Sequence, residues 1–447
     1  MKKTMIALVA GAVGLAMTAA VASAVDVNIN GASAEFTYWT AVAPLYLAAK
    51  TSAGGAGCTG TPVVKQASSS QYLVTATGCS LVSDTITIRV ASTNSLDGIQ
   101  SALNQGGDAN CTGRQRTMVK DTTGALSCQS VTLGASDVGG AAFGQTTTGN
   151  VNGPDDGLGI KTGYTTYVAS PVTIPSTVDT YQPIVVPFGF YLHSDVKVRT
   201  CSAGSGTTAA PTIYVGQQCT QNSDCGTTGG TCQAAAPVQG ISRLMAVQIF
   251  GGQVFNWTDF GAGYSASAPI TVCMRHAGSG TLATLQWGVM RDASWGSNML
   301  TTQMYPGVPG VQPETWFNNG TGTMMDCVNT RPGAIGYADA DRLATNPMTN
   351  VYGPIAYNGF LPTRVNIRNG VYDDFWAAQH IYHDQAEPSY NATKPVVDSL
   401  MAYAGTPANM PSGKAPYWAT QAELVYPKAT DDVYPVYGGG ASSPQSP

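Results

Sequence analysis

The sequence is poor in charge and in the motifs that mark common enzyme classes. Charged residues make up 11% of the 447 residues, and the formal net charge is −5 at pH 7. No basic stripe is present, so we expect no nucleic-acid partner, and any anion must be bound by a local site. The chain contains no HExxH, no Gly-rich nucleotide loop and no GxSxG in a strand-to-helix setting. We therefore expect a protein that is not an enzyme and needs no cofactor or metal.

Long apolar runs are missing after the first residues. Lys2 and Lys3 precede one apolar run, and Ala22-Ser23-Ala24 matches the small-residue pattern of a cleavage site, which predicts a signal peptide at 1–24. An uncleaved membrane anchor is the alternative, because the run reaches the lower length limit for a bilayer span. The mature chain from Val25 would carry 19 basic and 26 acidic residues, a balance of −7. We expect a bacterial protein that is periplasmic, secreted or on the cell surface, without stable membrane insertion after cleavage.

Cysteine, in contrast, is plentiful, with ten residues. In an exported chain this number predicts a disulfide framework. The spacing groups them into three pairs and a cluster of four, namely Cys58 with Cys79, Cys111 with Cys128, Cys273 with Cys327, and Cys201, Cys219, Cys225 and Cys232. The cluster has three possible connectivities. A zinc site there is less favoured, because its spacing lacks two CxxC knuckles.

Segments typical of strands and of helices alternate along the chain, which predicts an α/β fold. Strands are expected at 25–31, 86–91 and 183–193, and the spacing of Leu96, Ile99 and Leu103 predicts one buried helix face. A unit of strand, Ser/Gly/Thr turn and helix recurs at "INGASAEF", "VASTNSLDG" and "CMRHAGSGT". Helix N-termini present unpaired N–H groups, so three such turns and one arginine could surround an oxyanion.

With these blocks the chain resembles the periplasmic phosphate-binding proteins of ABC transporters, which have the type II periplasmic binding-protein fold. The matching blocks also include "LGASD", "IFGGQVFNW", "GAIGY" and "NGVYDDFWAAQHIY", in the order of that family. The resemblance implies two α/β lobes that close over phosphate or a related oxyanion, and an ABC transporter permease as a further partner. It assigns ligand contacts to the backbone of Phe36, to Ser95, to Asp137 as proton acceptor, to Arg275 as the charged clamp, and to Ser279, Gly280 and Thr281.

Three positions depart from that family. Glu35 stands where a threonine faces the ligand, Ala277 where an aspartate is usual, and Asp97 in place of a glycine. Compared with that family, this chain has two additional carboxylates at the site and lacks one, which predicts a more acidic site. Glu35 could replace the missing proton acceptor at the ligand, or it could hold Arg275 in a salt bridge. The ligand is accordingly phosphate or a similar oxyanion, another small molecule, or none.

The expected domains follow from the same blocks. Lobe I covers 25–180 and 345–437, lobe II covers 181–344 with a Cys-rich insertion at 200–238, and 438–447 is a Gly/Ser/Pro tail expected to be disordered. Further insertions are expected at 54–80 and 105–130. Such decoration also fits a secreted or cell-surface structural or interaction protein.

Three other features have plainer interpretations. "HIYHD" (380–384) could ligate a metal from a helix face, but a solvated helix end is favoured. His276 is expected to point away from the ligand, because adjacent strand residues alternate in direction. Ser279 could be mistaken for the nucleophile of a phosphomonoesterase, yet no partner base can be assigned to it.

Overall fold

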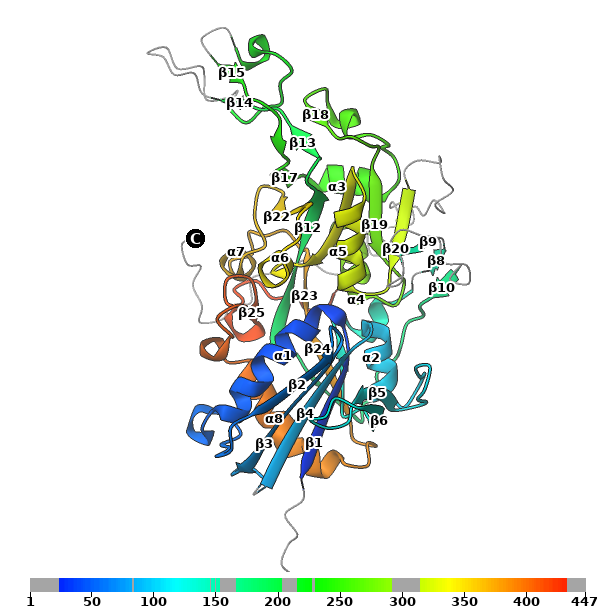
Figure 1. The fold of residues 1–447 in the computed structure, drawn as a ribbon, viewed down its shortest axis with the longest axis vertical. Coiled ribbons are helices and arrows are strands. Elements are labelled where there is room, and N and C mark those ends of the chain that lie inside the picture. Colours follow the sequence, from blue (N-terminus) through cyan, green and yellow to red (C-terminus); the bar gives the residue numbers. More distant parts are fainter. Residues whose placement is uncertain are drawn as a thin grey trace, which may run out of the picture.

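The computed structural model describes residues 24–82, 84–144, 146–148, 150–152, 166–202, 215–226, 230–291 and 314–431. Residues 1–23 of the expected signal peptide and the tail at 438–447 lie outside these ranges. The described chain forms two α/β lobes stacked along the long axis, with a narrow extension beyond the second lobe (Figure 1). This confirms the predicted α/β, two-lobe fold. None of the helices in the described ranges combines the length and the apolar character that a bilayer crossing requires.

The first lobe is built on a sheet of seven described strands. Their order is β11 (Val178–Tyr181), β24 (His380–Asp384), β7 (Leu133–Ser136), β1 (Val25–Gly31), β4 (Asp84–Ser92), β3 (Gln71–Cys79) and β2 (Val63–Ser68). β1 runs parallel to β4 and to β7. The carboxyl ends of these three strands therefore open on one edge, where α1 (Ser33–Ala48) and α2 (Ser95–Ala102) begin. α8 (Tyr390–Ala404) packs on α1.

The second lobe is built on a sheet of nine described strands. Seven of them follow the order β17 (Gly240–Ile241), β22 (Val351–Tyr357), β12 (Ile184–His193), β21 (Ala334–Asp339), β19 (Thr271–Arg275), β20 (Glu314–Asn318) and β9 (Asn150–Asn152). β23 (Trp376–Ala378) and β25 (Ala419–Thr420) pair with β12. The helices of this part are α3 (Arg243–Phe250), α4 (Gly280–Thr284), which continues as a π-helical segment over Leu285–Met290, α5 (Thr321–Thr330), α6 (Arg342–Thr345) and α7 (Arg364–Arg368).

The expected lobe boundaries need correction. β22 belongs to the second lobe, because it pairs with β12 through Phe190↔Ile355 and Leu192↔Tyr352, so this lobe extends past residue 345. β9, expected in the first lobe, pairs with β20 of the second. The buried strand β12 needs backbone partners along its whole length, and β21, β22, β23 and β25 supply them. The chain rejoins the first sheet at β24, which pairs with β7.

A buried ion pair joins both lobes to the C-terminal segment. Lys414 Nζ lies 2.5 Å from Asp341 Oδ2 and donates to Thr37 Oγ1 at 2.6 Å. Trp418 Nε1 donates to Asp341 Oδ1 at 2.7 Å. Asp341 follows β21 of the second lobe, whereas Thr37 lies on α1 of the first. Because a buried charge is costly unless it is paired, this Lys414 cluster holds the three segments together.

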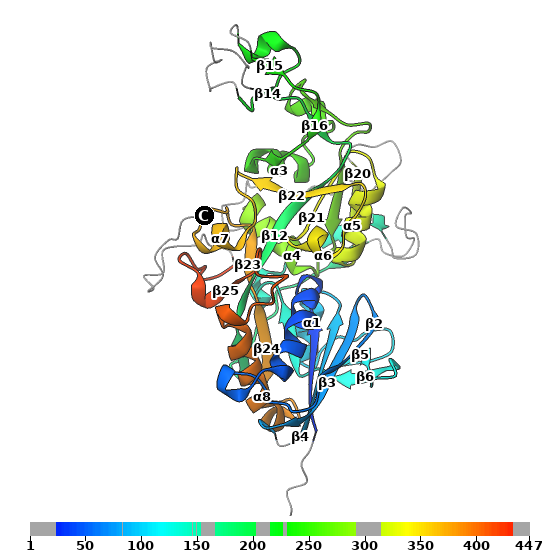
Figure 2. The ribbon, with the colours of Figure 1, turned by 60° about the vertical axis from the view of Figure 1, so that its left-hand side comes forward.

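All ten cysteines lie within the described ranges and form five disulfides, which join Cys58–Cys79, Cys111–Cys128, Cys201–Cys225, Cys219–Cys232 and Cys273–Cys327. The pairing inside the four-cysteine cluster uses all four sulfurs, which leaves no thiolate for zinc. These four cysteines form a small core of their own in the extension beyond the second lobe (Figure 2). Residues 54–80, expected as a surface insertion, instead contain β2 and β3 of the first sheet.

Candidate functional site

The three turns identified in the sequence meet where the two lobes touch. Ser95 Oγ, at the start of α2, and Thr281 Oγ1, on α4, donate to the same oxygen, Asp137 Oδ2, at 3.3 and 3.2 Å. The backbone N–H of Leu96 donates to Gly278 O at 3.1 Å across the lobes. A Cβ on Gly280 would lie 2.5 Å from Ser95 Oγ and 2.8 Å from Asp137 Cβ. Only glycine therefore allows this close approach.

The helices at this junction begin in different ways. Asn94 caps α2 by accepting from the N–H of Asp97 at 2.9 Å, and Ser279 caps α4 by accepting from the N–H of Leu282 at 3.3 Å. α1 begins at Ser33 without a side-chain cap. Because the first turn of a helix has N–H groups without partners inside the helix, the start of α1 can receive an anion.

Arg275 reaches from the end of β19 to the start of α1. Its Nε donates to Asn318 O at 3.2 Å and its Nη2 to Asn319 O at 2.9 Å. Its Nη1 donates to Ser33 Oγ at 3.1 Å. The side chain is 2% exposed, so its positive charge acts in a region from which water is largely excluded.

Glu35 and Asp137 form a buried pair of carboxyl groups. Glu35 Oε2 accepts from Trp39 Nε1 at 3.4 Å and from Gln379 Nε2. Burial raises the pKa of Glu35, and the neighbouring Asp137 raises it further. Burial also raises the pKa of Asp137, but Arg275, Thr281 and Ser95 oppose that rise. Two adjacent buried carboxyls cannot both ionise at little cost, so we assign a proton to Glu35 and the charge to Asp137.

This arrangement differs from one expectation for Glu35. Glu35 does not hold Arg275 in a salt bridge, since its hydrogen-bond partners are Trp39, Gln379 and Asp137. The reason is geometric, because Glu35 lies in the first turn of α1 and its side chain bonds Asp137, the residue that follows β7. Asp137, not Glu35, carries the negative charge that acts on Arg275.

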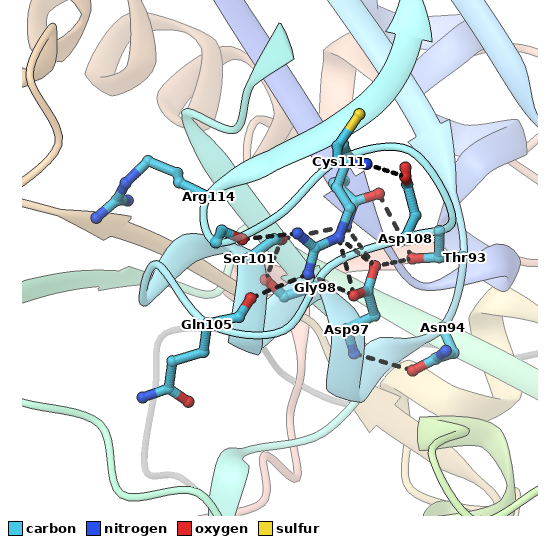
Figure 3. Close-up of polar contacts among 12 residues, drawn as sticks. Thr93, Asn94, Asp97, Gly98, Ser101, Gln105, Asp108, Cys111 and Arg114 are labelled. Atoms are coloured by element: carbon cyan, nitrogen blue, oxygen red, sulfur yellow. Dashed lines mark hydrogen bonds and ion pairs between the residues drawn. The ribbon is translucent and has the colours of Figure 1, made fainter. Parts of the chain in front are cut away.

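Asp97 does not make the site more acidic, contrary to the sequence-based expectation. Arg116 holds it through Nη2 to Oδ1 at 2.6 Å and Nε to Oδ1 at 2.9 Å. Thr93 Oγ1 donates to Asp97 Oδ2 at 2.8 Å (Figure 3). Asn30 Nδ2 donates to the same oxygen at 2.9 Å. Arg116 lies on β5 (Gln115–Val119), which pairs with β6 (Leu126–Ser130) in the Cys111–Cys128 insertion. The insertion thus neutralises a charge that the sequence places at α2.

His276 and Ala277 follow β19 directly. His276 lies in the interlobe region, and its Nδ1 accepts from the N–H of Gly278 at 3.2 Å. Burial, with a contribution from Arg275, lowers the pKa of His276 to about 3, so the ring is neutral. Ala277 is fully buried and brings no charge.

The "HIYHD" segment is a strand, β24, and not a helix. His380 Nε2 lies 3.4 Å from Asp431 Oδ2, whereas His383 Nε2 lies 3.2 Å from Thr393 Oγ1. Residues three apart in a strand point to opposite faces, so the two histidines cannot share a metal ion.

A cleft of about 770 Å³ opens beside Arg275, and the sequence did not reveal it. Ser33 and Asn319, which bond the Arg275 guanidinium, are among its lining residues. The other walls come from the β2–β3 turn, the start of α2, the start of α5 and Arg342. The polar runs "STNS" and "NNGTGT", each beginning at the last residue of a strand, were the available signal.

Comparison with known proteins supports the resemblance seen in the sequence. Residues 223–432 match the model of the PBP superfamily domain. No curated protein matches the chain. Similar solved structures include a human phosphate binding apolipoprotein, with 14% identity over 88% of this chain and 89% of that one and a TM-score of 0.43. An ABC-type phosphate transport receptor from Vibrio cholerae has 13% identity over 84% of this chain and 93% of that one, with a TM-score of 0.38.

Arg275, Ser279, Gly280 and Thr281 all lie inside the matched segment, whereas Glu35, Phe36, Ser95 and Asp137 precede it. The part of the chain that supplies the arginine and its turn therefore lies in the segment that is similar to the PBP superfamily domain, residues 223–432.

Proposed function

We propose that this protein is an exported solute-binding protein that binds phosphate or a similar tetrahedral oxyanion between its lobes. The observation that carries the proposal is the meeting of Arg275, the uncapped start of α1 and the hydroxyls of Ser95 and Thr281 around Asp137. The two hydroxyls already donate to a negatively charged oxygen, and an oxyanion presents the same kind of acceptor. Each charge-assisted bond contributes about 1.5–3 kcal/mol.

Asp137 and Glu35 have different roles in this proposal. Asp137 accepts a hydrogen bond from a protonated oxygen of the ligand, which favours an oxyanion that still carries a proton. Glu35, being protonated, adds no repulsive charge. Phe36, Ser279 and Gly280 contribute through the backbone at the starts of α1 and α4. Delivery to a transporter permease and a periplasmic or cell-surface location belong to the same proposal.

Thermal unfolding of the oxidised mature protein tests the binding function. Phosphate or arsenate at about 1,000 times its Kd should stabilise the protein by about 4 kcal/mol. Arg275→Ala should remove this stabilisation, and Thr281→Val should weaken it with little change in packing. Lys197→Gln, an exposed residue on β13 (Lys197–Val198), is the charge-matched control. Absence of any shift with phosphate, arsenate or sulfate in the wild type contradicts the proposal.

A second candidate is a structural or interaction protein of the same fold without a ligand. The observation in its favour is that Asp137 already accepts from the Ser95 and Thr281 hydroxyls. It predicts no shift with any oxyanion. Hydrolysis is less favoured, because the Ser279 hydroxyl caps α4, and we expect no turnover of a chromogenic phosphomonoester by the wild type or by Ser279→Ala.

A further inference from the structure

The interlobe cleft is larger than an inorganic oxyanion needs. Its volume of about 770 Å³ lies in the range of about 300–1,000 Å³ that is usual for sites of small organic molecules. It is continuous with the proposed oxyanion site, because Ser33 and Asn319 line it and also bond Arg275. Thr321, another lining residue, has its Oγ1 within hydrogen-bond distance of Ser33 Oγ, at 3.2 Å. A ligand held at Arg275 therefore has room to extend into the cleft.

The lining of the cleft has a distinctive chemistry. Most of its side chains carry a hydroxyl or an amide, and among the lining residues there is no aspartate, glutamate or lysine. The charged lining residue is Arg342, since burial keeps His276 neutral. Hydroxyl and amide groups both donate and accept, so they suit a ligand with its own hydroxyls. The lack of carboxylates removes the repulsion that a negatively charged ligand would meet.

Arg342 is the first residue of α6, and its guanidinium forms no hydrogen bond within the described part of the chain. The Nε atom is buried and has no partner. Its Nη2 lies 3.8 Å from the point that a Cβ on Gly322 would occupy, which places the guanidinium beside the first turn of α5. Burial raises the pKa of Asp326 and of Asp339, the carboxyls on which its charge acts, so neither is a strong ion-pair partner. A buried donor without an acceptor is costly, and a ligand oxygen would relieve that cost.

Two arginines therefore flank the start of α5. Arg275 Nη2 bonds Asn319 O, two residues before α5, and Arg342 lies beside Gly322, the second residue of α5. Its N-cap residue, Gly320, has no side chain to accept from the first turn, and Thr323 Oγ1 accepts from the N–H of Gly320 at 3.2 Å. We propose that the cleft binds an organic compound with two acidic groups and hydroxyls, in chemical class a phosphorylated hydroxy acid. Its phosphate lies at Arg275 and its second acidic group at Arg342, so the inference rests on the proposed oxyanion function.

Calorimetric titration with three probes tests this inference. The probes are inorganic phosphate, glycerol 3-phosphate and 3-phosphoglycerate, of which only the last combines a phosphate with a carboxylate. We expect the wild type to bind 3-phosphoglycerate about tenfold or more tightly than glycerol 3-phosphate, because a guanidinium–carboxylate contact is worth at least that factor. Arg342→Gln should bring this ratio to about one and leave inorganic phosphate unchanged.

The matched control and the outcomes separate this inference from the proposed function. Lys197→Gln removes the same unit of charge in the extension and should keep the wild-type ratio. Two outcomes would contradict the proposed binding of a second acidic group at Arg342 and leave the oxyanion site intact. In the first, the wild type binds phosphate and has equal affinities for the two esters. In the second, the affinity ratio of the two esters is unchanged in Arg342→Gln. Binding of none of the three probes overturns both. Unfolding curves of Arg342→Gln that match those of the wild type exclude a folding defect as the cause.

Discussion

At the scale of single residues, the least expected feature is the buried carboxyl pair in which Glu35 holds the proton and Asp137 the negative charge. The sequence identified both residues as candidates, and it also identified Ser95, Arg275 and Thr281, which the structure brings to the same junction. It could not identify the relation between Glu35 and Asp137. That relation depends on burial and on Trp39 and Gln379, and Gln379 lies 344 residues from Glu35 in the chain.

The Glu35 pair makes stability depend on pH. Burial raises the pKa of Glu35 above its ordinary value of 4.5. At pH values between the ordinary and the raised pKa, the folded state therefore binds more protons than the unfolded state. The free energy of unfolding should therefore fall as pH rises above about 5, by up to about 1.4 kcal/mol per pH unit. Glu35→Gln should flatten this decline in urea unfolding. Glu387→Gln, the same change at a glutamate bonded to Ser389, should not. Identical slopes for the wild type and Glu35→Gln would refute the assignment of the proton to Glu35.

At the scale of elements, the sequence predicts the strand–turn–helix units, because buried strands and helix starts have characteristic local residue patterns. β1 has the limits expected for it, and Leu96 and Ile99 lie on the buried face of α2. The segment 380–384 was read as a helix because its histidine spacing fits one. Pairing with β7 and β11 makes it a strand, and such pairing between distant segments has no local signal.

The contact between α2 and the Cys111–Cys128 insertion can be tested by substitution. Arg116→Ala removes the partner of a largely buried Asp97 and should lower the free energy of unfolding by about 3 kcal/mol. Adding Asp97→Asn should restore part of this loss, with a coupling of about 1 kcal/mol or more in a double-mutant cycle. Lys120→Ala, at an exposed site just after β5, should change stability by less than about 0.5 kcal/mol. Strictly additive effects of the Arg116 and Asp97 changes would contradict the pairing.

At the scale of the whole molecule, composition and segment order were sufficient for two α/β lobes but not for their limits. The expected boundary returns the whole chain to the first lobe at about residue 345. β12 instead pairs with four later strands, β21, β22, β23 and β25, and local sequence does not predict such pairing. The same holds for the interlobe cleft, whose walls come from turns far apart in sequence.

The Cys-rich extension should unfold separately from the lobes, because its buried core consists of its own four cysteines. Cys201→Ser with Cys225→Ser opens a link that spans 24 residues and should cost about 3 kcal/mol within the extension. Hydrogen exchange at residues 215–226 and 230–232 should become fast, while the main thermal transition and any phosphate shift stay unchanged. Cys273→Ser with Cys327→Ser removes the disulfide between β19 and α5. This double change should lower the temperature of the main unfolding transition. A lowered main transition in the extension variant would show that the extension is part of the lobe fold.

The Lys414 cluster has a mechanical consequence. Lobes that part must either break the contacts of Lys414 with Asp341 and Thr37 or turn about them. Breaking a buried ion pair costs about 3–5 kcal/mol, so turning is the cheaper motion. The Lys414 cluster then lies on the axis about which the lobes rotate. The C-terminal segment that carries Lys414 and Trp418 is therefore part of the hinge between the lobes.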